Sequence, residues 1–141
     1  MTTTDAATTT TTTPRKAATL PLIGTGLVAT VAASAATSLV ATAGHAAGIS
    51  LDVSGAPIPI SGFATLTAVF SLVGVVLAIV LSRVARRPRT AFLRTTVALT
   101  VLSFVPDVIA DAAPATKLLL ILTHLVAAAI VIPAVARRLS A

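Results

Sequence analysis

Four long apolar stretches, separated by short polar or basic segments, constrain this chain more than any other feature. We predict helices at about residues 18–44, 61–84, 90–110 and 115–136. A transmembrane helix needs about 20 predominantly apolar residues, and these stretches suffice. Only 10% of the 141 residues are charged, which is too few to cover a surface that faces water. The sequence therefore predicts an all-α domain over 18–139, built as an antiparallel bundle of four transmembrane helices.

The Lys and Arg residues predict how this bundle is oriented. Only Lys117 lies in a segment left for the outer side of the membrane. The other nine can share one side: Arg15, Lys16, Arg83, Arg86, Arg87, Arg89, Arg94, Arg137 and Arg138. Cytoplasmic flanks carry the excess of Lys and Arg. We therefore predict a multi-pass protein of the cell membrane with the N- and C-termini cytoplasmic.

The first 17 residues differ in composition from the rest of the chain. Nine of residues 1–13 are Thr, and this polar sequence has nothing to bury, so we predict a disordered cytoplasmic tail over 1–17. A secretory signal peptide is an alternative interpretation of the first apolar stretch, because Ala41-Thr42-Ala43 resembles a cleavage site. We favour an uncleaved helix, since signal-peptide apolar cores are only about 7–15 residues long.

The third stretch carries the weakest signal, because only the twelve residues Thr95–Pro106 are free of charge. Apolar runs of about 10–14 residues can instead be re-entrant or interfacial. A full span is favoured if Arg94 reaches the inner interface and Asp107 lies close to the outer one. It also keeps the C-terminal arginines inside.

The loop at 45–60 is predicted to face outward. Apolar and small or polar residues alternate before Ser54-Gly55, which favours a small hairpin. Pro57 and Pro59 weaken a regular ladder, so an irregular ordered loop is an equal alternative.

His124 is the sharpest single candidate for function, because it lies near the middle of the fourth stretch. Ionisable residues inside a membrane often mark proton or ion paths. The alternative is a neutral imidazole bonded to a Ser, Thr or backbone group. Asp107 is the obvious possible partner, about 6–8 Å nearer the outer surface if each residue rises ~1.5 Å. The alternative is that Asp107 and Asp111 simply end the third helix at the outer interface. Pro106 and Pro133 are candidate helix kinks.

Small residues recur at four-residue spacing in the first stretch: Gly26, Thr30, Ser34, Ser38 and Thr42. Such spacing lets helix backbones approach closely in lipid. The stripe predicts tight packing of this helix and indicates no particular function.

Several classes of chemistry lack their motifs here. The chain has no Cys, no nucleophile elbow and no phosphate loop, so we predict no enzyme activity and no cofactor. His45, Asp52, Asp107 and Asp111 are acceptable metal ligands, but no diagnostic spacing joins them and we predict no metal site. A net charge of +6 raises nucleic acid as a partner. The basic residues flank apolar helices and have no aromatic residues between them that could stack on bases. We therefore predict that nucleic acid is not a partner.

Several short motifs recur together in this chain. They are Ile58-Pro59-Ile60 with Gly62-Phe63-Ala64, Leu72-Val73-Gly74, the basic turn Arg86-Arg87-Pro88-Arg89 with Phe92, Leu102-Ser103 with Val105-Pro106-Asp107, and His124-Leu125-Val126-Ala127-Ala128 before Ile132-Pro133-Ala134 and Arg137-Arg138-Leu139. With them, residues 20–139 resemble a family of four-helix integral membrane proteins of unknown function from high-GC Gram-positive bacteria. The resemblance implies the four-span topology and draws attention to His124, Asp107 and Pro133. It implies no mechanism.

These observations favour a non-enzymatic accessory or scaffold subunit that works by helix packing. A small-molecule or proton-coupled transport component that uses His124 and Asp107 is the alternative. The expected partners are the lipid bilayer and either a second copy of the chain or another membrane protein.

Overall fold

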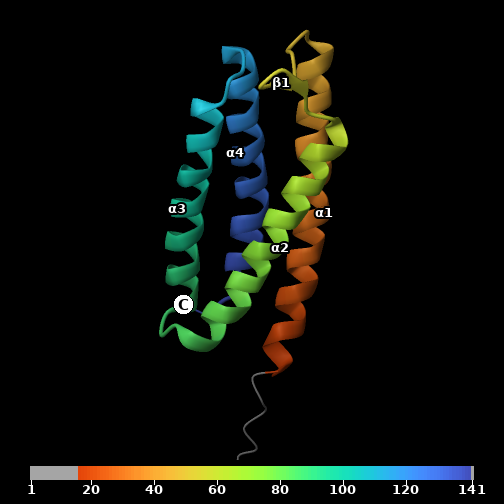
Figure 1. Ribbon diagram of the computed structural model, residues 1–141. Coiled ribbons are helices and arrows are strands. Elements are labelled where there is room, and N and C mark those ends of the chain that lie inside the picture. Colours follow the sequence, from red (N-terminus) through yellow and green to blue (C-terminus); the bar gives the residue numbers. More distant parts are fainter. Residues whose placement is uncertain (1–15, 141) are drawn as a thin grey trace, which may run out of the picture.

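The structure is a computed structural model that describes residues 16–140, and four helices dominate it (Figure 1). They are α1 (Lys16–Ala46), α2 (Ile60–Val84), α3 (Pro88–Ile109) and α4 (Pro114–Ala136). Each is long and apolar enough to cross a membrane, which confirms the predicted all-helical class and the four candidate spans. The bounds differ from the predicted ones by at most two residues. Most of the predicted Thr-rich tail lies outside the described residues.

Successive helices are joined at alternate ends of the bundle (Figure 1). The α1–α2 loop and the α3–α4 connection lie at one end, which we call the hairpin end. The α2–α3 turn and the C-terminus lie at the other, which we call the turn end. α1 packs extensively against α2 and α4, whereas α3 packs less extensively against the same two helices. α2 and α3 lie together at their turn and diverge toward the hairpin end (Figure 1).

Proline begins two of the four helices. Pro88 and Pro114 occupy the first turns of α3 and α4, where a missing N–H costs nothing and the fixed φ suits the helix. α3 is thus a continuous helix of 22 residues, long enough for the full span. The turn before it therefore spans residues 85–87, shorter than the interval 85–89 between the predicted helices, because Pro88 starts the helix.

The loop between α1 and α2 contains the predicted small hairpin. Strands β1 (Asp52–Val53) and β2 (Ala56–Pro57) pair antiparallel. Ser54 and Gly55 between them have φ of 54° and 79°. Positive φ at both central residues is the type I′ geometry, which matches the twist of a two-residue hairpin.

Hydrogen bonds attach this loop to the α3–α4 half of the bundle. The Ser54 amide donates to the Asp111 carbonyl at 2.7 Å. The Thr116 hydroxyl on α4 donates to the Ser50 carbonyl. The hairpin therefore joins the two helix pairs at this end of the molecule.

Apolar residues form two separate clusters along the bundle. The turn-end core is the larger and contains Leu22, Ala29, Ala33, Val75, Ala78, Phe92, Val131, Val135, Ala136 and Leu139. The hairpin-end core contains Ala41, Leu51, Phe63 and Leu119. Between these clusters the buried side chains are mainly polar.

Packing of α1 follows the small residues at its start. A Cβ placed on Gly26 would lie only 2.5 Å from Cγ2 of Val75, so only glycine allows α2 this close. Farther along, the buried face passes through Ala33, Thr37 and Ala41, while Thr42 is exposed. The buried row takes one step of three residues, from Gly26 to Ala29, whereas the predicted stripe takes only steps of four. Each step of four rotates about 40° around a helix of 3.6 residues per turn, so the predicted stripe leaves the buried face toward Thr42.

Candidate functional site

A polar layer separates the two apolar cores, and all four helices contribute to it. Three hydroxyl residues mark its level. Thr37 lies between Ala33 of one core and Ala41 of the other, and Thr67 and Thr123 lie between core residues on α2 and α4 in the same way. With the side chains that contact or adjoin these three, the polar layer comprises Ser34, Thr37, Thr67, Asp107, Thr123 and His124.

The two residues singled out by the sequence meet in this layer. Nδ1 of His124 lies 3.0 Å from Oδ2 of Asp107. In Figure 1, α3 ends below the start of α4. This offset moves Asp107 away from the hairpin end and brings it to the depth of His124. Equal helix ends would have left the two side chains at different depths. The stagger of α3 and α4 therefore creates the contact.

The same nitrogen also faces a backbone carbonyl. Nδ1 of His124 lies 2.9 Å from the Leu120 carbonyl oxygen, and this contact has hydrogen-bond geometry. Oδ2 of Asp107 is buried and has no aligned hydrogen bond among the described residues, although it lies within ion-pair distance of the imidazole. Two oxygens so close to one nitrogen would repel an unprotonated Nδ1. A proton therefore lies either on Nδ1 or on the Asp107 carboxyl.

His124 lies at the flank of the bundle, whereas Asp107 is enclosed. The side chain of His124 is 37% exposed and that of Asp107 is 9% exposed. The imidazole and the Phe104 ring lie nearly perpendicular to each other, with the ring centroids 6.3 Å apart. Both polar contacts use Nδ1, so Nε2 has no hydrogen-bond partner within residues 16–140. His124 is ten residues into α4, or ~15 Å along its axis, so it lies near the middle of this candidate span.

The other half of the layer is a contact between α1 and α2. The hydroxyl oxygens of Thr37 and Thr67 lie 3.0 Å apart, and Thr37 also donates to the Ser34 carbonyl. Oγ of Ser34 is buried without a partner among the described residues. Neither Thr37 nor Thr67 was predicted from the sequence. The pattern that could have identified them is a hydroxyl residue at a helix position that continues a row of buried apolar residues.

Two predicted outer-face residues lie elsewhere. His45 and Asp52 border a cavity at the hairpin end, apart from the polar layer. In the part of the chain that the structure describes, no group of three His, Asp, Glu or Cys residues is arranged to hold a metal ion. Pro106 and Pro133 lie inside α3 and α4, and Pro106 cannot donate the usual helical bond to the carbonyl four residues before it.

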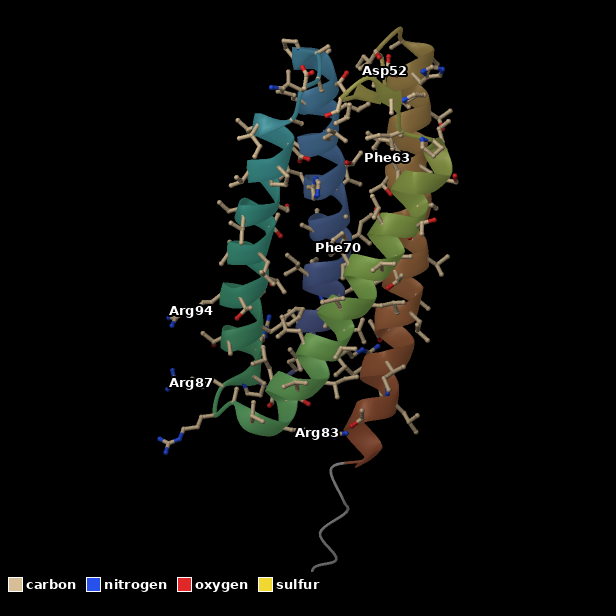
Figure 2. The ribbon with its side chains drawn as sticks, viewed as in Figure 1. Asp52, Phe63, Phe70, Arg83, Arg87 and Arg94 are labelled. Carbon is tan, nitrogen blue, oxygen red and sulfur yellow. The ribbon has the colours of Figure 1, made fainter. Side chains whose placement is uncertain are left out.

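The arginines gather toward the turn end (Figure 2). Arg83, Arg87 and Arg94 lie in that half of the bundle, whereas Asp52 lies at the opposite end. Arg138 turns back to α1, and its Nε donates to the Thr25 hydroxyl at 2.9 Å. The amide of Arg89 donates to the Ser140 carbonyl. The C-terminal residues therefore close the turn end, with Leu139 buried in its core.

Comparison with known proteins identifies the family of this four-helix chain. Residues 17–141 match a protein family described as "Family of unknown function (DUF6069)". The chain belongs to this family. The match begins one residue after the start of α1 and covers the rest of the four-helix bundle in Figure 1, including the polar layer. No similar curated protein and no similar solved structure was found.

Proposed function

We propose that this protein is a non-enzymatic integral membrane subunit, and that it supports another membrane protein or a second copy of itself by helix packing. The observation that carries the proposal is the 37% exposure of His124 at mid-membrane depth. A lone bundle would present the free Nε2 of this imidazole to hydrocarbon. Polar groups without partners are costly there, so a neighbouring helix that accepts or donates a hydrogen bond stabilises the assembled form.

The surroundings of His124 also favour packing. One turn further on, Ala127 and Ala128 are small, which lets another helix approach α4 closely. The two cavities found at the hairpin end include no residue of the polar layer. These features support a contact surface better than a substrate chamber.

The proposal includes a location and an orientation. We place the protein in the cytoplasmic membrane of a bacterium, with the turn end and both termini inside. The concentration of arginines at the turn end supports this orientation, because cytoplasmic flanks carry the excess of positive charge.

The test is the mass of the purified protein in a mild detergent. We expect the wild type to elute as a dimer or with a co-purifying membrane protein. His124→Leu should elute as a monomer with an unchanged circular dichroism spectrum. Leu125→Ala, at the adjacent and 48% exposed position, is the matched control and should keep the assembly. A wild type that is monomeric both in detergent and in lipid nanodiscs contradicts the proposal.

Proton-coupled transport is the second candidate, and the proton held between His124 and Asp107 favours it. A proton placed between an imidazole and a carboxylate can be exchanged if water reaches the pair. The test is proton flux into liposomes that contain the purified protein. Transport requires flux in the wild type that both His124→Ala and Asp107→Asn abolish while the fold is retained. No wild-type flux at any pH excludes it.

A further inference from the structure

A cavity of about 360 Å³ opens at the hairpin end, beneath the α1–α2 loop. Its apolar wall comes from Leu51 and the segment Pro57–Ile60, which leads into α2. Its polar side comes from His45, Ser50 and Asp52. A volume in this range accommodates a small ligand, and an apolar wall with a few convergent polar groups is typical of ligand sites.

The polar groups of this cavity are free to bind a ligand. The carboxylate of Asp52 takes part in no ion pair and accepts no hydrogen bond from the residues that the structure describes. Only its backbone amide is engaged, donating to the Ser50 hydroxyl at 3.1 Å. The imidazole of His45 likewise makes no hydrogen bond or ion pair within residues 16–140. Figure 2 shows Asp52 at the hairpin end, far from the arginines.

The Asp52 carboxylate gives the cavity a negative charge, which favours a cationic ligand. A carboxylate without a cationic partner attracts an ammonium group, and charge-assisted hydrogen bonds are the stronger ones. Lys117 is a basic residue at the same end of the bundle, near the start of α4, and its Nζ donates to the Val108 carbonyl at 2.9 Å. The apolar wall adds area for a short hydrocarbon body beside the charged head.

We propose that this cavity binds a primary ammonium group attached to a small apolar body, with Asp52 holding the ammonium and Leu51 and Ile58 contacting the hydrocarbon. His45 and Ser50 supply further hydrogen-bonding groups. The ammonium comes either from a free amine or from an ethanolamine lipid headgroup at the membrane surface. None of these residues belongs to the polar layer, so this site stands or falls independently of the proposed function.

The experiment measures binding to the full chain in phosphatidylcholine nanodiscs. The probes are butylammonium, its neutral analogue 1-butanol, and dihexanoyl phosphatidylethanolamine. The readout is the thermal unfolding midpoint followed by circular dichroism, because a ligand that binds only the folded state raises it. We expect butylammonium or the ethanolamine lipid to raise the midpoint, and 1-butanol to leave it unchanged.

Variants make the assignment specific. Asp52→Asn should weaken binding by about tenfold or more, since a charge-assisted hydrogen bond is lost. Asp52→Glu keeps a carboxylate and should retain binding. Asp111→Asn is the matched control, because Asp111 is an exposed carboxylate at the same end that does not border the cavity. A response to butylammonium identifies a free-amine site, and a response to the lipid alone identifies a headgroup site. Equal responses to butylammonium and 1-butanol, or unchanged binding in Asp52→Asn, overturn the proposal.

Discussion

At the scale of single residues, the contact between His124 and Asp107 is the most consequential feature of this bundle. The sequence predicted both residues but not their contact. Apolar periodicity places helices along the chain, whereas the level of one helix against another depends on tertiary packing. The stagger of α3 against α4 brings the two side chains to the same depth, and the residues near Asp107 do not indicate this stagger.

We predict that His124 and Asp107 are energetically coupled. His124→Ala removes the imidazole that lies 3.0 Å from the buried Asp107 carboxyl group, and Asp107→Ala leaves the imidazole with one carbonyl. Each single substitution should lower stability, and the double variant should cost less than the sum by about 1–3 kcal/mol. Thermal or denaturant unfolding in detergent measures the cycle. Additive effects would show that the pair carries no net interaction energy.

At the scale of secondary structure, α1 and α2 form the most extensive contact between helices in the described part of the chain. The sequence predicted close packing of α1 from its small residues. It could not predict which of them would be buried, because a segment made mostly of Gly, Ala, Ser and Thr offers a small-residue stripe in almost any direction. The actual face was set by the position of Val75 and the other side chains on α2.

We therefore predict that Gly26→Ala destabilises the bundle by about 1–3 kcal/mol through overpacking. The added Cβ would meet the stiff, β-branched Val75 at 2.5 Å. Gly24→Ala is the matched control, because a Cβ there has no neighbour within 4 Å. The unfolding midpoint measures both. Combining Gly26→Ala with Val75→Ala should restore much of the loss, and a loss that persists would point to a cause other than this contact.

The hairpin yields a second prediction at this scale. Gly55 has φ of 79°, and a β-branched residue there is strained by about 1–3 kcal/mol. Gly55→Val should therefore open the hairpin and expose the Ser54 amide, which is otherwise bonded to the Asp111 carbonyl. Hydrogen exchange followed by mass spectrometry over residues 50–58 should become faster. Unchanged exchange would mean that the bond to Asp111 does not hold the hairpin.

At the scale of the whole molecule, the four spans and their connections were predictable from the sequence. Length and hydropathy decide whether a helix can cross a membrane, and Pro88 and Pro114 fix where two helices begin. The two-core arrangement was not predictable. It arises because hydroxyl residues on three helices reach the same level, and matching those levels requires the packed structure.

The orientation gives a prediction at this scale. Because the chain contains no Cys, single cysteines can be introduced without background. Ser61→Cys lies near the hairpin end and should react with a membrane-impermeant maleimide on intact cells. Thr90→Cys lies near the turn end and should react only after lysis. Both positions are exposed in the structure. The reverse pattern would place the termini outside.

The links at the two ends of the bundle determine how it can deform. At one end the hairpin joins α1 and α2 to the other two helices through Asp111 and Thr116. At the other, Arg138 and Ser140 reach Thr25 and Arg89. Hydrogen bonds thus join the α1–α2 pair to the α3–α4 pair at both ends of the bundle. The contacts of the polar layer, His124 with Asp107 and Thr37 with Thr67, join helices within each pair. Lateral tension in the bilayer that pulls the two pairs apart would therefore be resisted by hydrogen bonds at the two ends of the bundle and, among the described residues, by side-chain packing between those ends.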